Sequence, residues 1–88
     1  MKFVWNGTNI EHIARHGISP EQAAYIVVHV RRPYPQMVGD GKRLAIGRLA
    51  DGQYVQVAYV PSRSVEGAVY VMHARTDDEK RKFRRRSR

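Results

Sequence analysis

The feature that most constrains the fold of this chain is a pair of stretches with alternating polar and apolar residues, joined by Asp51-Gly52. The stretches cover residues 42–50 and 53–60, and a period of two is typical of β-strands. An Asp-Gly pair between two such stretches predicts a β-hairpin, because both residues tolerate the positive φ angles of a tight turn. The hairpin would fill much of one surface with apolar side chains, namely those of Leu44, Ile46, Val55, Val57 and Tyr59.

Two helices are predicted before the hairpin. The first covers residues 8–16, where apolar residues recur at helical spacing, and Gly17 suits the C′ position that ends a helix. The second has a clearer start, because Ser19 is a favourable N-cap and Gln22 completes a capping box. Its apolar face continues to about residue 30.

Further strands are predicted on both sides of these elements. Residues 3–5 form a short strand that ends at Asn6-Gly7, and residues 68–75 form the last strand. Residues 31–41 are a proline-containing connection, within which a short strand over residues 36–38 also fits the pattern.

The end of the chain predicts a final helix. Thr76 and Glu79 form the capping-box pattern T-x-x-E ahead of a helix over about residues 77–85. The predicted fold class is therefore α+β, with two N-terminal helices packed on a small antiparallel sheet of three to four strands and a short C-terminal helix.

The length and composition of the chain limit what it can be. Its 88 residues form one domain, residues 1–88, with a modest core. It has no Cys, which excludes a disulfide framework and a thiolate metal site. No apolar run approaches the roughly 20 residues of a membrane helix, and the first residues lack the apolar segment of a signal peptide. These features predict a cytoplasmic protein that does not associate with a membrane.

The net charge of +8 is concentrated at one end of the chain. Residues 1–79 contain nine Lys or Arg and eight Asp or Glu, a net charge of +1. Residues 80–88 contain seven basic residues and no acidic one, a net charge of +7. Such a basic tail indicates contact with a polyanion, most simply nucleic acid. The alternative is a solvated end that keeps the protein soluble.

Most familiar catalytic patterns are absent from the sequence. His12 and His16 are four residues apart, as two zinc ligands on a helix would be, but the stretch H-I-A-R-H lacks the Glu of H-E-x-x-H and no third ligand follows. The chain also has no nucleophilic-serine motif, no P-loop and no G-x-G-x-x-G. We therefore expect no metal and no cofactor.

What remains is a set of cationic side chains and a carboxylate near the end of the chain. Arg75 ends the last predicted strand, and Glu79 lies in the first turn of the following helix. An arginine cannot act as a base, but it can hold a phosphate and stabilise the charge that develops there. This inventory suits phosphodiester cleavage in RNA, where the 2′-OH of the substrate is the nucleophile. The alternative is a surface salt bridge between Arg75 and Glu79, worth ~0–1 kcal/mol.

The chain resembles the BrnT-like toxins of bacterial type II toxin–antitoxin pairs over nearly its whole length. The matching segments are F-V-W at residues 3–5, R-H-G-I-S at 15–19, K-R-L-A-I-G at 42–47 and T-x-x-E-K-R-x-F at 76–83. The resemblance implies a RelE-like fold and RNA cleavage that arrests translation. It also implies neutralisation by a cognate antitoxin, typically a ribbon-helix-helix DNA-binding protein, through which the pair represses its own operon.

The resemblance also implies roles for particular residues. Arg75 and Glu79 match the strand-end Arg and the helical Glu of the family, Arg43 matches the Arg that opens the central strand, and His16 matches the His of R-H-G. These four residues are the candidates for metal-independent cleavage by 2′-OH attack, in which Glu79 or His16 transfers protons. The candidates for RNA binding are Arg48, Lys80, Arg81, Lys82, Arg84, Arg85 and Arg86.

One departure from the family pattern concerns the corner between the last strand and the last helix. Thr76 follows Arg75 directly, where relatives often have extra residues, so Glu79 is aimed differently. Two other interpretations therefore stay open. One is a module of the same fold that binds nucleic acid or a protein without cleaving RNA. The other is a structural subunit that is stable only within a heterocomplex. The expected partners are RNA and the antitoxin, with operator DNA bound only through the antitoxin.

Overall fold

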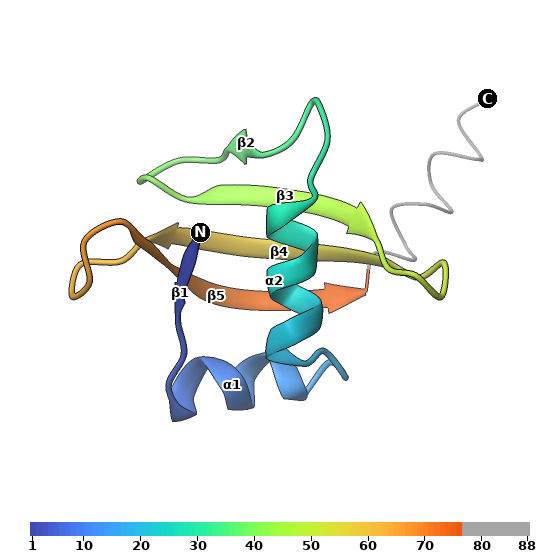
Figure 1. Ribbon diagram of the computed structural model, residues 1–88, viewed down its shortest axis with the longest axis horizontal. Helices are drawn as coiled ribbons and strands as arrows, with labels where there is room; N and C mark the ends of the chain where they lie inside the picture. The colour runs from blue at the N-terminus through green and yellow to red at the C-terminus, as the bar shows by residue number, and fades with distance from the viewer. Residues whose placement is uncertain (77–88) are drawn as a thin grey trace.

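The computed structural model describes residues 1–76 of the chain. The elements in order are β1 (Lys2–Val4), α1 (Gly7–Ala14), α2 (Pro20–Val28), β2 (Gln36–Met37), β3 (Arg43–Arg48), β4 (Tyr54–Pro61) and β5 (Ala68–Thr76). The strands form a single sheet in the order β1-β5-β4-β3-β2. The predicted α+β class is confirmed, with two helices on a five-stranded mixed sheet (Figure 1).

The sheet is not wholly antiparallel, and in this respect the prediction was wrong. β1 pairs in parallel with β5, with Lys2 opposite Ala68 and Val4 opposite Tyr70. Parallel neighbours need a long connection, and here both helices and three strands lie between the two partners in the sequence. A strand of three residues carries no local signal of so distant a partner. The remaining strand pairs are antiparallel, as predicted.

The first helix begins one residue earlier than predicted because Asn6 caps it. The Asn6 side chain accepts a hydrogen bond from the backbone N–H of Asn9, and the Asn9 side chain accepts one from the N–H of Asn6. After Ala14 the chain leaves the helix through Gly17, which has a φ of +74°. The N–H of Gly17 donates to the Ala14 carbonyl and that of Ile18 to the Ile13 carbonyl, the pattern of a Schellman motif. Gly17 therefore occupies the predicted C′ position.

The second helix starts with the predicted capping box. Ser19 Oγ accepts a hydrogen bond from the N–H of Gln22, and Gln22 Oε1 accepts one from the N–H of Ser19. The helix ends at Val28 and His29 is its C-cap, slightly before the predicted end.

The hairpin between β3 and β4 has a three-residue loop rather than the predicted two-residue turn. The N–H of Leu49 donates to the Gln53 carbonyl at 2.8 Å, which leaves Ala50, Asp51 and Gly52 in the loop. Gly52 has a φ of +91°, as expected for the left-handed position of such a loop.

The extra loop residue shifts the strand pairing by one and moves two predicted core residues. Leu44 pairs with Ala58 and Ile46 with Gln56, so they lie on the opposite face from Val55, Val57 and Tyr59, although Ile46 is itself buried there. The prediction fails because a shift of one residue reverses the face that each side chain of a strand occupies. In their place Gly47 faces α2, where a Cβ would lie 3.3 Å from Cδ1 of Ile26.

The hydrophobic core lies between the sheet and the helices. Figure 1 shows α2 crossing one face of the sheet and α1 lying beside β5. The core residues are Ile13, Ile18, Ala23, Ile26, Val27, Ala45, Leu49, Val55, Val57, Tyr59, Val71 and Ala74.

The opposite face of the sheet, turned away from α2, is called the far face below. It carries the residues that alternate with core residues along the strands. On this face Ala58 of β4 lies opposite His73 of β5, and Gln56 of β4 lies opposite Arg75.

The predicted C-terminal helix over residues 77–85 lies outside the described residues. Within residues 1–76, neither helix has the length and apolar character needed to cross a bilayer.

Candidate active site

The candidate site is built around His73 on the far face of β5. His73 and Arg75 are two residues apart on one strand, so their side chains share a face, while Ala74 between them is fully buried in the core. The pairing between β4 and β5 is irregular next to His73, because Ala58 pairs with His73 but Tyr59 pairs with Val71. Such a bulge inserts an extra residue into one strand and re-aims the side chains beside it.

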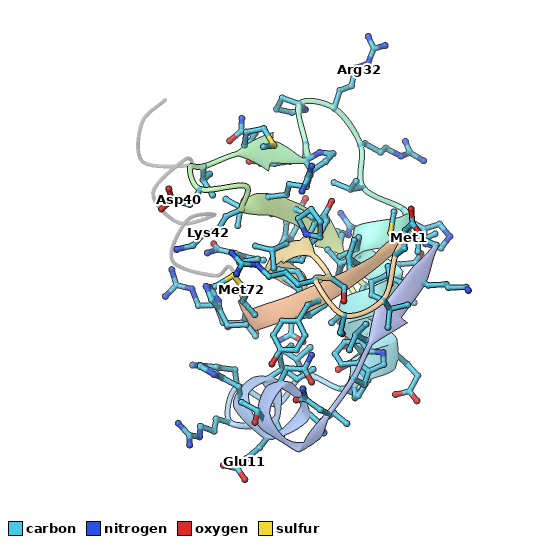
Figure 2. All side chains as sticks on the ribbon, turned by 90° about the vertical axis from the view of Figure 1, so that its left-hand side faces the viewer. Met1, Glu11, Arg32, Asp40, Lys42 and Met72 are labelled. Atoms are coloured by element: carbon cyan, nitrogen blue, oxygen red, sulfur yellow. The ribbon has the colours of Figure 1, made fainter. Side chains whose placement is uncertain are left out.

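The extra residue at this bulge is Met72. Figure 2 shows that Met72 and Lys42 lie on the side of the sheet turned away from α2. The far face therefore receives side chains from the residue just before β3 and from the bulged part of β5.

Helix α1 and the turn that follows it bring two more imidazoles to this site. The ring centroid of His12 lies 6.4 Å from that of His73, with the ring planes 33° apart. His16 lies in the turn after α1, four residues beyond His12, and its charge acts on His73.

The position of α1 is fixed by Asn9, which is buried although it is polar. Its side-chain Nδ2 donates to the Val4 carbonyl at 3.0 Å, and its Oδ1 accepts from the Asn6 N–H at 2.9 Å. Both polar groups of the amide are thus satisfied, as a buried side chain requires. These bonds tie α1 to β1, and β1 is in turn paired to β5.

Burial and neighbouring positive charges act on His73 in the same direction. Burial is the largest cause that lowers the pKa of His73 below its ordinary value of 6.5, and the charge of Arg75 is next. The charges of His12, His16 and Lys42 lower the pKa further. At neutral pH the His73 imidazole is therefore uncharged and has a ring nitrogen that can accept a proton.

The arrangement unites two functions that phosphodiester chemistry requires. A neutral imidazole can serve as a general base, and the guanidinium and ammonium groups around it can hold an anionic group. The groups that shift His73 within residues 1–76 are all cations or imidazoles. The site is thus suited to an anionic substrate.

The structure brings together only some of the residues that the sequence predicted. Arg75 and His16 lie close enough to His73 for their charges to act on it. Arg43 does not act on His73. Its Nη1 donates to the Gly41 carbonyl at 3.1 Å, and its charge acts on Tyr59, whose pKa is raised by burial more than Arg43 lowers it.

Arg48 also lies apart from His73, at the other end of β3 from Lys42. Its guanidinium carbon is 5.9 Å from the centroid of the Tyr54 ring, within the range of a cation–π contact. The other candidates lie outside the described residues, namely Glu79, Lys80, Arg81, Lys82, Arg84, Arg85 and Arg86.

Sequence reasoning missed His73 and Lys42 as site residues. One signal was present, because the stretch M-H-A-R places His73 and Arg75 on the same face of a strand. The sequence could not predict that α1 and Lys42 lie near His73, because this depends on how distant elements pack.

The three imidazoles do not form a metal site. No group of three His, Asp or Glu side chains within residues 1–76 is arranged to hold a metal ion.

No family model, curated protein or solved structure matches this chain.

Proposed function

We propose that this protein is the toxin of a type II toxin–antitoxin pair, an endoribonuclease of the BrnT-like kind with a RelE-like fold. The observation that supports this most is the partly buried imidazole of His73 beside Arg75 on one strand face, with the charges of His12, His16 and Lys42 acting on it and its pKa lowered. An RNA phosphodiester supplies its own nucleophile, so the protein has only to move protons and stabilise the anionic phosphate.

The proposed reaction begins when His73 takes the proton of the 2′-OH. The 2′ oxygen then forms a bond to phosphorus while the bond from phosphorus to the 5′ oxygen breaks, leaving a 2′,3′-cyclic phosphate and a 5′-hydroxyl. Arg75 and Lys42 would hold the phosphate oxygens and stabilise the charge that grows on them. His16 or Glu79 would give a proton to the departing 5′ oxygen.

The rest of the proposal concerns partners. The basic tail over residues 80–88 would add RNA affinity without sequence preference. A ribbon-helix-helix antitoxin in the same cytoplasm would neutralise the toxin, and the pair would bind operator DNA through that antitoxin alone.

The first test is cleavage of purified RNA in the presence of EDTA. We expect the chain to shorten RNA and to leave 2′,3′-cyclic phosphate ends, and to leave an all-2′-O-methyl copy of the same RNA intact. Arg75→Ala and His73→Gln should each lower kcat/KM by at least about a hundredfold, the usual contribution of one phosphate-stabilising group or general base. Arg63→Ala is the matched control, since Arg63 is an exposed arginine in the loop between β4 and β5.

Two results would contradict the proposal. One is full activity in folded Arg75→Ala and His73→Gln variants. The other is a gel shift of the RNA with no change in its length, which would identify a binding module rather than an enzyme. Growth arrest on expression, relieved by Arg75→Ala or Glu79→Ala, is the corresponding result in cells.

A further inference from the structure

A groove runs along the outer edge of β3, and none of the described residues that the proposed reaction uses lines it. Its volume is about 880 Å³. It is bounded by the C-terminal end of α2, the connection that follows this helix, and the ends of β3 and β4 nearest their hairpin. β2 pairs only with Arg43 and Leu44, so within residues 1–76 no strand covers this part of the edge of β3. This space is called the edge groove below.

The lining of the edge groove is cationic and aromatic. Arg31, Arg32 and Arg48 contribute guanidinium groups, and Tyr25, Tyr34 and Tyr54 contribute phenol rings. No Asp or Glu is among the described residues that line it. The neighbouring hollow beside α2 differs in this respect, because both Glu21 and Asp51 line it.

The arginines of the edge groove are available to an anionic ligand. Within residues 1–76 one salt bridge is present, between Arg15 and Glu11. No carboxylate of this range therefore pairs with Arg31, Arg32 or Arg48. All three arginines are exposed.

Ring contacts already hold part of the lining in place. Arg48 lies over the face of Tyr54, and the ring of His29 stacks on Tyr25 at a centroid distance of 4.2 Å. Flat rings next to guanidinium groups are the surfaces on which single-stranded nucleic acids stack their bases, while the arginines contact the phosphates.

The far face connects the edge groove to the His73 site. Arg75 pairs with Gln56, and Gln56 pairs with Ile46, which lines the groove. Two strand spacings, about 10 Å, separate Arg75 from Ile46 along this row.

We propose that the edge groove binds a single-stranded segment of the RNA substrate, with phosphates on Arg31, Arg32 and Arg48 and a base against Tyr54. The identity of this ligand rests on the proposed function, which the groove extends by requiring an unpaired substrate longer than the scissile dinucleotide. A duplex would not fit this role, because its bases are stacked on each other and not available to the tyrosines.

The binding test uses fluorescein-labelled 2′-O-methyl oligouridylates of increasing length, which the protein cannot cleave, and fluorescence anisotropy with the full chain. Arg48→Ala, the double variant Arg31→Ala with Arg32→Ala, and Tyr54→Ala should each weaken binding of the longer oligomers about tenfold. Each lost arginine should also reduce the slope of log K against log salt by about 0.7. Arg63 is an exposed arginine outside the groove. Arg63→Ala should therefore leave unchanged the ratio between the affinities for long and for short oligomers.

The cleavage test separates the groove from the active site. A dinucleoside monophosphate reaches only the His73 site, so the groove variants should cleave it like the parent chain. They should show a raised KM and an unchanged kcat on a longer RNA.

The results distinguish the failure of this inference from the failure of the proposed function. If folded groove variants bind long oligomers as the parent chain does, the groove is not an RNA site. Preferential binding of a polyglutamate peptide, with RNA affinity unchanged by the variants, would likewise overturn the inference and identify an acidic protein segment as the occupant. If the chain cleaves no RNA but the groove variants still lose oligomer affinity, the groove assignment stands and the nuclease assignment falls. Circular dichroism confirms that each variant is folded.

Discussion

At the scale of single residues, the chemistry proposed for this protein depends on how the surroundings of His73 change its pKa. His73 would have an ordinary pKa in an extended chain, but burial and the charge of Arg75 lower that pKa in the fold. The cations that would attract a phosphate therefore also lower the pKa of His73 and so favour its uncharged form. Residue type alone does not distinguish His73 from the other three histidines of the chain.

We expect the pKa of His73, measured by NMR titration of its imidazole, to lie below 6.5. Arg75→Ala should raise it towards 6.5 by removing a neighbouring positive charge, whereas Arg63→Ala should not move it. Between the folded pKa and 6.5 the unfolded chain binds more protons at this residue, so His73 makes the fold less stable as the pH falls through this range. His73→Gln should accordingly reduce the loss of stability on acidification, measured by urea unfolding. A His73 pKa above 6.5 would contradict the assignment of this residue as the base.

At the scale of elements, the β3–β4 hairpin shows how one loop residue decides the composition of two faces. The three-residue loop ending at Gly52 places Gly47 against α2 and Ile46 on the far face. Because Gly47 has no side chain, Ile26 can approach the strand closely. With the two-residue turn, Gly47 would instead lie on the far face, and this position would accept a larger side chain.

Gly47→Val therefore tests the register. We expect it to lower the free energy of unfolding by about 1–3 kcal/mol, because the added methyl groups would overlap Ile26 in a packed layer. Gln56→Val, on the far face of β4, is the control and should change stability by no more than about 0.5 kcal/mol. Both are measured by urea unfolding. Equal tolerance of the two substitutions would indicate the other register.

At the scale of the whole molecule, the two faces of the sheet carry different kinds of side chain. One side carries the core beneath the helices, and the far face carries His73 and Arg75. Charge is also distributed unevenly along the chain, since residues 1–79 carry a net charge of +1 and residues 80–88 a net charge of +7. Helix α1 links the two sides, because Ile13 enters the core while His12 approaches His73.

Asn9 is the residue that holds this link, since its amide joins α1 to β1. Asn9→Ala should lower the free energy of unfolding by about 1–3 kcal/mol, because it leaves buried backbone groups without partners. The urea midpoint should fall while the slope of the transition stays the same. Glu11→Gln on the same helix removes only an exposed ion pair and should cost less than about 1 kcal/mol. If Asn9→Ala were as stable as Glu11→Gln, the helix would be held by its apolar contacts alone.

Several features of this fold are determined by residues that are close together in the sequence. The Ser19–Gln22 capping box, the left-handed Gly17 and the presence of the hairpin all depend on interactions within a few positions, so local patterns predict them. The concentration of positive charge after Glu79 is likewise a property of the sequence itself. Arg75 and His16 could be nominated from the sequence by their residue types and by their positions at the ends of predicted elements.

The features that make up the site depend on distant residues and were decided by the tertiary structure. The parallel pairing of β1 with β5 joins segments separated by most of the chain, and it places α1 beside His73. The hairpin register depends on which side chains pack best against α2, and the altered pKa of His73 depends on burial and on charges from α1 and the start of β3. The sequence by itself determined which local elements form and where the charge lies. Only the tertiary structure decided which histidine has a lowered pKa, because burial and the proximity of distant charges do not exist before the chain has folded.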